Sequence, residues 1–180
     1  MKFTCTVRGK ILLDAYKTWI KNNSSVLDVG CGDGSMGKMI GDEFKCEIQG
    51  TDIMDFVKGR IPFKIMSSET KLPYRNKEFD FAMLNDMLHH TRKQKEILLE
   101  ALRVADNVLI FDTRPTFSAK VLDHVLNWQH NVKMPIPLTH RTPEGWKSLF
   151  EKMGLKSEYR EPEHSFMYPV SHFAFRVWKK

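Results

Sequence analysis

The segment 26–34 reads Val-Leu-Asp-Val-Gly-Cys-Gly-Asp-Gly, so that Gly30, Gly32 and Gly34 alternate with other residues. An apolar run typical of a buried strand precedes the glycines, and a helical pattern of apolar residues follows them. A glycine-rich turn between a strand and a helix brings bare backbone N–H groups up to a ligand, and the helix start favours negative charge there. The segment therefore predicts that the backbone binds an anionic group of a ligand.

The spacing of these glycines separates two classes of cofactor. The dinucleotide fingerprint G-x-G-x-x-G needs its third glycine at the position of Ser35, but the third glycine is Gly34, so a dehydrogenase is the least favoured enzyme. An acid, Asp52, ends the next strand pattern and follows Gly30 by 22 residues. This is close to the interval of ~20 residues at which a carboxylate binds ribose hydroxyls. An isolated aspartate would be a solvated turn residue, but after the glycine motif ribose binding is favoured.

Four side chains are candidates for a general base. His89 and His90 follow a third apolar run, Asp112 ends a fourth, and His140 lies farther along the chain. Histidine exchanges a proton near neutral pH, so it suits proton removal from a substrate. A structural role for the adjacent histidines and a turn-capping role for Asp112 remain open alternatives.

No metal site is expected. His124 and His130 are not separated by a spacing typical of metal ligands. Cys5, Cys31 and Cys46 are scattered without a C-x-x-C motif, which indicates neither a zinc site nor a disulfide framework.

Strands that alternate with helices must position these residues. Strand patterns occur at 26–29, 46–52, 79–85, 108–112, 155–160 and 171–179, and helical stripes at 9–21, 96–103 and 143–153. Thr142 and Pro143 are typical of a helix start. The alternation predicts an α/β fold with a mostly parallel sheet, to which the final strand pair adds an antiparallel strand.

Length and composition limit the class of protein. A chain of 180 residues has room for a single domain with one three-layer core. Its 42% hydrophobic and 28% charged residues are ordinary for a globular protein. No apolar run approaches the ~18 residues of a membrane span, and segment 1–5 lacks the features of a signal peptide. The expected location is the cytoplasm.

Positive charge gathers in the last third of the chain. Up to Asp112 there are 17 Lys and Arg against 16 Asp and Glu, a net charge of +1, whereas from Thr113 onward there are 11 against 6, a net charge of +5. This third could face an anionic substrate or a nucleic acid. Because no cluster of cations is dense, a solvated surface is the favoured explanation.

A long connection, residues 113–141, follows the strand that ends at Asp112. Segment 118–130 within it has a helical stripe, and Phe117, Trp128 and Met134 could line an apolar pocket, although such residues more often belong to a core. A segment of this length after a strand end usually covers the adjacent crevice. We therefore expect residues 113–141 to form a substrate cap.

The glycine motif, Asp52 and segment 79–90 together resemble the class I S-adenosylmethionine-dependent methyltransferases. Segment 79–90 is similar to motif IV of the type 11 group, which includes the ubiquinone and menaquinone methylases and many small-molecule enzymes. The resemblance extends from about residue 24 to the C-terminus. It implies a Rossmann-like three-layer αβα sandwich with a mostly parallel seven-stranded sheet and an antiparallel last strand. It also implies S-adenosyl-L-methionine as cofactor.

The resemblance assigns roles around the cofactor. The backbone of Gly30, Cys31, Gly32 and Gly34 would hold its carboxylate, Asp28 and Asn85 its ammonium, Asp52 its ribose, and Ile53 would pack on its adenine. Relatives carry an aspartate for the adenine amino group where this chain has Ser68, with Glu69 beside it. The adenine contact is therefore either Ser68 or Glu69. Relatives with unrelated acceptors share the histidine pair, which supports a structural role for it.

The predicted reaction is direct in-line methyl transfer to a small-molecule acceptor, which by itself requires no metal or covalent intermediate. One alternative is methylation of RNA or protein through the basic last third. Segment 85–88, Asn-Asp-Met-Leu, does not resemble the Asn-Pro-Pro-Tyr motif used on base amino groups. Another alternative is a non-catalytic cofactor-binding module. The acceptor and the oligomeric state stay open.

Overall fold

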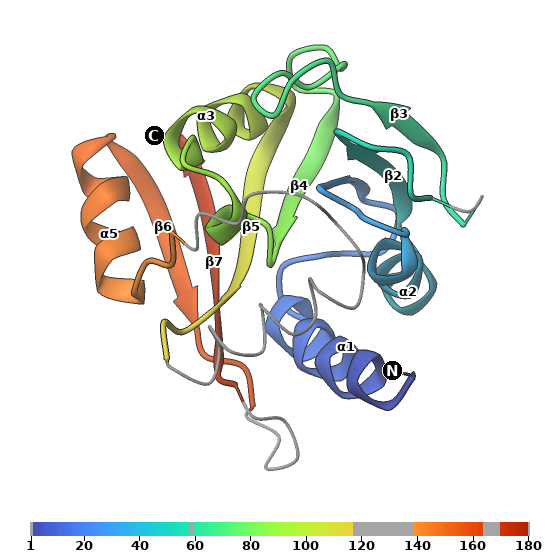
Figure 1. Cartoon of the computed structure of the whole chain (residues 1–180), viewed down its shortest axis with the longest axis horizontal. Coiled ribbons are helices and arrows are strands. Elements are labelled where there is room, and N and C mark those ends of the chain that lie inside the picture. Colours follow the sequence, from blue (N-terminus) through green and yellow to red (C-terminus); the bar gives the residue numbers. More distant parts are fainter. Residues whose placement is uncertain (1, 58–59, 117–138, 164–169, 180) are drawn as a thin grey trace.

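The computed structural model describes residues 2–57, 60–116, 139–163 and 170–179 (Figure 1). The helices are α1 (Lys2–Tyr16), α2 (Ser35–Phe44), the 3-10 turn η1 (Leu88–His90), α3 (Gln94–Val104) and α5 (Pro143–Lys152). The strands are β1 (Ser25–Val29), β2 (Glu47–Asp52), β3 (Phe63–Ile65), β4 (Phe79–Asn85), β5 (Ala105–Thr113), β6 (Leu155–Arg160) and β7 (His172–Lys179).

The strands form one seven-stranded sheet in the order β3-β2-β1-β4-β5-β7-β6. Strands β1 to β5 are mutually parallel where they pair, and β7 runs antiparallel to both β5 and β6. This confirms the predicted α/β fold, its mostly parallel sheet and its antiparallel last strand. The chain builds outward from β1 to β3 and then returns to place β4 on the other side of β1, so the strand order reverses between β1 and β4.

Helices cover both faces of the sheet, as the predicted three-layer sandwich requires (Figure 1). Successive side chains of a strand point to opposite faces. Leu27 and Val29 of β1 therefore pack in the cluster that contains α3 and α5. Val26 packs in the cluster with α1 and α2. All three side chains are fully buried, which is why β1 reads as a nearly continuous apolar run.

Local signals position the helix ends. Thr142 caps α5 because its hydroxyl oxygen accepts a hydrogen bond from Gly145 N at 3.1 Å. Gly154 follows α5 with φ 67, a left-handed conformation that favours glycine. The first helix differs from its predicted range of 9–21, because it ends at Tyr16. Trp19 and Ile20 are buried as the stripe predicted, but they lie in the turn that follows, where both N–H groups donate to Tyr16 O.

The predicted helix 118–130 lies outside the described residues, as do Phe117, Trp128, Met134 and the two histidines of that segment. Within the described ranges, no helix has the length and apolar character needed to cross a membrane.

Candidate active site

The reversal of strand order between β1 and β4 is where open α/β sheets bind ligands, at the carboxyl ends of the strands. In the register of the two strands, Asp28 pairs with Met83 and Val29 with Leu84. The glycine turn leaves the end of β1 and Asn85 ends β4, so the predicted cofactor residues Asp28, Gly30 and Asn85 lie at the same edge of the sheet.

The glycine turn is left-handed at each of its glycines. Gly30 has φ 70, Gly32 φ 53 and Gly34 φ 75, values at which a side chain is strained. A Cβ added to Gly30 would lie 3.2 Å from Met87 Cβ, whereas one added to Gly32 would meet nothing within 4 Å. The Cα face of Gly32 is therefore open, and a ligand can approach the backbone there.

The N–H groups of this turn are already engaged. Gly30 and Cys31 donate to Thr51 O at 2.8 and 3.2 Å, Gly34 donates to Cys31 O at 2.9 Å, and Gly32 donates to Asp52 Oδ2 at 3.0 Å. Each of the four N–H groups therefore has a partner in the described chain, and binding of an anion by this backbone stays a prediction. The turn also presents the Cα face of Gly32.

Cys31 contributes only its backbone to the turn. Its side chain is buried, and a Cβ on Gly50 would come within 2.8 Å of Sγ. Burial, together with the charges of Asp28 and Asp52, raises the pKa of the Cys31 thiol far above its ordinary value. A thiol in these surroundings stays protonated and is inert as a nucleophile.

Asp52 joins the end of β2 to the glycine turn. Its Oδ2 accepts from Gly32 N and its Oδ1 accepts from Ile53 N at 2.7 Å. Oδ1 also accepts from Met54 N at 3.4 Å, whereas Oδ2 has one partner and can accept a further hydrogen bond, so the group is oriented and still able to bind a hydroxyl. Ile53 follows with 38% of its surface exposed, which leaves an apolar face available beside Asp52.

Asp28 is a buried acid that carries an unsatisfied oxygen. It is 2% exposed, and no hydrogen bond reaches its Oδ2 from the part of the chain that the structure describes. A Cβ on Gly37 would lie 2.8 Å from that oxygen, so the start of α2 packs closely against it. Burial, and then the charge of Asp52, raises the pKa of Asp28 to about 7, against the opposing charge of Arg8. Such a carboxyl suits a cationic ligand group, whose approach would compensate the buried charge.

Asn85 is held by Tyr16, which the sequence did not single out. The Tyr16 hydroxyl donates to Asn85 Oδ1 at 2.6 Å in a buried contact between α1 and β4. This bond uses one lone pair of the side-chain carbonyl. An amide oxygen can accept a second hydrogen bond, so the contact of the Asn85 carbonyl or side chain with the ammonium stays a prediction. Tyr16 belongs to an apolar helical stripe, and nothing in its spacing distinguishes it from a core residue.

A second contact ties α1 to the end of β4. Arg8 Nη2 lies 2.5 Å from Asp86 Oδ2, and Asp86 has a left-handed φ of 47 while its N–H donates to Phe111 O at 2.8 Å. Burial would raise the pKa of Asp86, but the charges of Arg8, His172 and His89 outweigh it and hold that pKa below its usual value. The sequence carried no signal for Arg8, because the contact joins segments far apart in the chain.

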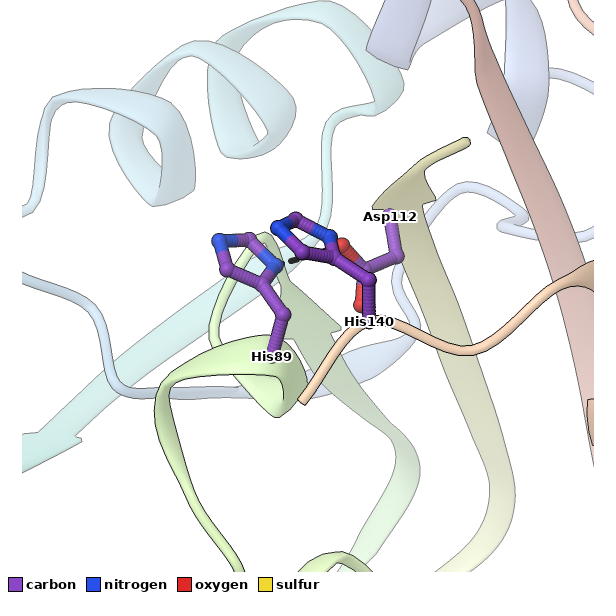
Figure 2. A group of neighbouring side chains, drawn as sticks. All are labelled: His89, Asp112 and His140. Carbon is purple, nitrogen blue, oxygen red and sulfur yellow. Dashed lines mark hydrogen bonds and ion pairs between the residues drawn. The ribbon is translucent and has the colours of Figure 1, made fainter. Parts of the chain in front are cut away.

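Three of the four predicted base candidates meet in one cluster, and the fourth packs beside them. His89 Nδ1 lies 2.6 Å from Asp112 Oδ1, with both side chains almost fully buried (Figure 2). The His140 ring stacks on that of His89 at 4.5 Å and 11°. The His90 ring lies 4.1 Å from that of His89, tilted by 50°. The structure thus joins the ends of β4 and β5 through a carboxylate–imidazole contact.

His89, Asp112 and His140 bring their possible metal-ligand atoms within 4.8 Å of one another. Two ligands of a tetrahedral zinc ion, each about 2.0–2.1 Å from it, are separated by roughly 3.3 Å. The 2.6 Å separation of His89 Nδ1 and Asp112 Oδ1 is that of a hydrogen bond instead. The lone pairs of a histidine lie in its ring plane, so two parallel rings do not direct them at one point. The arrangement is that of a histidine oriented by a carboxylate.

The two adenine candidates are directed to different places. Glu69 accepts from Thr91 Oγ1 at 3.0 Å and pairs with Lys93 Nζ at 2.7 Å, and the hydrogen bond from Lys93 lowers its pKa. Ser68 lines an open cavity of about 1040 Å³ beside β3, together with Lys71. Glu69 would have to leave its partners to reach an adenine, whereas Ser68 would not.

The fold has many solved relatives. A possible histamine N-methyltransferase from Thermotoga maritima superposes with a TM-score of 0.67 at 18% identity, covering 99% of this chain and 94% of that one. Magnesium protoporphyrin IX methyltransferase from Synechocystis, solved with S-adenosylhomocysteine, superposes with a TM-score of 0.67 at 15% identity, covering 98% and 84%. A methyltransferase from Aquifex aeolicus gives 0.63 at 18% identity, covering 98% and 96%. At such low identities the likeness establishes the fold.

Family membership comes from the sequence itself. A search of curated proteins found no significant match. The family model described as a methyltransferase domain matches residues 8–159, which is most of the chain. The match confirms the predicted enzyme class and its methyl donor, S-adenosylmethionine. This chain belongs to the methyltransferase domain family.

Proposed function

We propose that this methyltransferase transfers a methyl group from S-adenosylmethionine directly to a small-molecule acceptor. The observation that carries the proposal is the convergence at the edge of one sheet of a donor site and a buried proton-accepting pair. Asp28, Gly32 and Asp52 lie at the ends of β1 and β2, and the His89–Asp112 pair lies at the ends of β4 and β5. The donor supplies an activated methyl group, so positioning and exclusion of water are what the protein must add.

The residues at the switch point fit the donor. Asp52 would accept from the ribose hydroxyls, and Asp28 Oδ2 would receive the ammonium. Gly30, Cys31, Gly32 and Gly34 would contribute their backbone, with the Cα face of Gly32 in contact.

Ile53 would pack against the adenine, and Ser68 is favoured over Glu69 for the adenine edge because Glu69 is already paired. Asn85 would receive the ammonium through its carbonyl or its side chain, whose oxygen Tyr16 orients.

Burial of the histidine cluster supports a small acceptor. His89 is 1% exposed, so an acceptor that reaches it must enter an enclosed site, which is the usual form of a small-molecule pocket. An RNA or protein acceptor would depend on the basic last third of the sequence, but the cations there form no dense cluster.

We also propose that residues 113–141 cover the acceptor. Both described ends of this segment are fixed beside the cluster. Thr139 N donates to His89 O at 2.9 Å and Thr139 Oγ1 donates to Thr91 O at 2.7 Å. At the other end, Arg114 N donates to Ser171 O at 2.9 Å.

The acceptor class can be tested with donor labelled on its methyl group and a native cell extract divided by ultrafiltration at ~3 kDa. We expect the wild-type protein to place the label in the low-mass fraction. The Asp52→Ala protein is the matched negative control. Label in the RNA or protein fraction would contradict the small-molecule proposal, and donor binding without transfer to either fraction would favour the non-catalytic alternative.

A further inference from the structure

We propose that His89 is the general base of the reaction and that Asp112 positions it, so that the acceptor is a molecule whose nucleophile loses a proton as it is methylated. The inference rests on the proposed function. The acceptor would then be a compound that reacts through a hydroxyl or through a nitrogen that carries a hydrogen. Acceptors that attack without losing a proton are excluded.

The first argument is the direction of the imidazole. Nδ1 of His89 faces Asp112 Oδ1 at 2.6 Å, and Asp112 is the penultimate residue of β5. The carboxylate accepts a hydrogen bond from Nδ1–H, which leaves Nε2 as the basic nitrogen of the neutral ring. In the sheet, β5 lies on one side of β4 and β1 lies on the other. Because Nδ1 of His89 points toward β5, Nε2 lies on the side of the ring away from β5, as Figure 2 shows.

The second argument is the orientation of the carboxylate itself. Asp112 Oδ1 also accepts from Thr113 N at 2.8 Å, and the Asp112 side chain is 3% exposed. Two donors therefore fix one oxygen, and the ring of His89 is held between this oxygen and the stacked ring of His140. These contacts fix the orientation of the ring before an acceptor arrives.

The third argument is energetic. A buried carboxylate–imidazole pair contributes little net stability, since desolvation offsets the attraction, and an apolar pair of equal size is often as stable. A purely structural contact at this place gains nothing from being ionisable. The His89–Asp112 pair lies at the carboxyl ends of β4 and β5, beside the switch point, where a group that exchanges a proton can serve the reaction.

The step balances as follows. His89 Nε2 receives the proton that the acceptor's oxygen or nitrogen releases as that atom bonds to the methyl carbon. The carbon–sulfur bond breaks and its electron pair stays on sulfur, which leaves the neutral thioether product. The imidazolium formed on His89 faces the negative charge of Asp112, which lowers the energy of that charged state.

Among the residues that the structure describes, the charged and titratable groups that interact with His89 include Asp112 on β5, Asp86 after β4, His90 on η1 and His140 on the returning segment. Two of them are acids that favour the protonated ring. The other two are histidines, and they supply the matched controls for any titration ascribed to His89.

The test uses two donor analogues and needs no acceptor. Sinefungin carries an amine where the donor carries its reactive methyl, and S-adenosylhomocysteine carries nothing there. If His89 faces the transferred methyl, its protonation repels the sinefungin amine. Calorimetry on the full chain should show that the affinity for sinefungin, relative to that for S-adenosylhomocysteine, rises about threefold or more between about pH 5.5 and 8.

Variants assign the change to the proposed pair. His89→Gln should remove the pH dependence of the affinity ratio, whereas His90→Gln and His140→Gln should keep it. Asp112→Asn should shift the change to lower pH, because the protonated ring loses its carboxylate partner. An unchanged midpoint in Asp112→Asn would show that this carboxylate does not stabilise the protonated His89 ring. Should His89→Gln fail to fold, the wild-type titration and the two control variants still decide the assignment.

An affinity ratio that is independent of pH in the wild type would overturn the proposal, as would a pH dependence that persists in His89→Gln or disappears in either control. Activity or binding that requires added zinc would overturn it in favour of a metal site. Failure of both analogues to bind would instead overturn the proposed function on which the inference rests.

Discussion

The hydroxyl of Tyr16 donates to Oδ1 of Asn85 at 2.6 Å, across 69 residues of sequence. Both side chains are buried. The bond fixes the N-terminal helix against the end of the strand beside the switch point. Together with the Arg8–Asp86 pair one position farther along, it makes α1 part of the wall of the site.

Tyr16→Phe should therefore affect both stability and binding. The change leaves the buried Asn85 carbonyl without its donor, which costs about 1–3 kcal/mol. We expect a matching loss in the free energy of unfolding by urea and a several-fold weaker affinity for S-adenosylhomocysteine. Tyr159→Phe is the control, because its hydroxyl bonds to Arg114 and the exposed Glu161, which remain paired with each other when it is removed. Equal effects of the two changes would show that the Tyr16 hydroxyl has no special role.

Arg8→Gln should loosen α1. The substitution leaves Asp86 charged and largely buried without its closest cation, at a cost of about 2 kcal/mol or more. Amide hydrogen exchange along α1 should then rise, and unfolding should occur at lower urea concentration. Lys17→Gln removes an exposed pair with Asp14 just after the same helix, and it should change neither measurement. Protection of α1 that survives Arg8→Gln would contradict this role.

The free protein should lose stability as pH rises toward neutrality, because the buried Asp28 carboxyl then ionises. Its folded pKa of about 7 lies above the ordinary 3.8, so its contribution is complete below about pH 3.8 and is lost as pH rises through about 7. Asp28→Asn cannot ionise and should flatten this part of the pH dependence of unfolding. The same slope in both proteins would mean that Asp28 keeps its ordinary pKa when folded.

Binding of the donor product should release a proton from the same residue. An ammonium at Asp28 Oδ2 favours the carboxylate, so at about pH 6.5 S-adenosylhomocysteine should displace roughly half a proton or more. Calorimetry in buffers of different ionisation enthalpy measures this number. Release that is unchanged in Asp28→Asn would place the ammonium elsewhere.

The covering role of residues 113–141 predicts a separation of binding from transfer. Replacing 117–138 by a flexible glycine–serine linker should leave affinity for S-adenosylhomocysteine nearly unchanged and abolish labelling of the low-mass extract fraction. Retained labelling would show that the acceptor is covered by another part of the chain.

The sequence predicted the elements that local signals mark. β4 at 79–85 and β6 at 155–160 have the predicted bounds, because apolar side chains and turn residues mark their ends. β3 was not delimited, since an edge strand of three residues, two of them exposed, carries too little pattern. The roles of Tyr16 and Arg8 could not be predicted, because each depends on packing between distant segments.

The glycine turn shows the same limit at the site. Its left-handed conformation follows from the glycines themselves, but the destination of its N–H groups does not. Thr51 O reaches Gly30 and Cys31 only because β2 pairs with β1 in one register, Val29 opposite Thr51. The contact between His89 and Asp112 likewise exists because β4 and β5 are neighbours in the sheet. Neither residue, considered alone in the sequence, indicates that the two strands are adjacent.

Calorimetry of S-adenosylhomocysteine and NAD with wild-type protein and Asp52→Ala tests the proposed donor site most directly. We expect micromolar-range binding of S-adenosylhomocysteine, no binding of NAD, and a loss of about 1–3 kcal/mol in Asp52→Ala because the acceptor of the ribose hydroxyls is removed. Asp106→Ala, which replaces an exposed acid near the opposite edge of the sheet, should bind like wild type. Binding of NAD without S-adenosylhomocysteine, or an unchanged dissociation constant in Asp52→Ala, would show that this site does not bind the methyl donor.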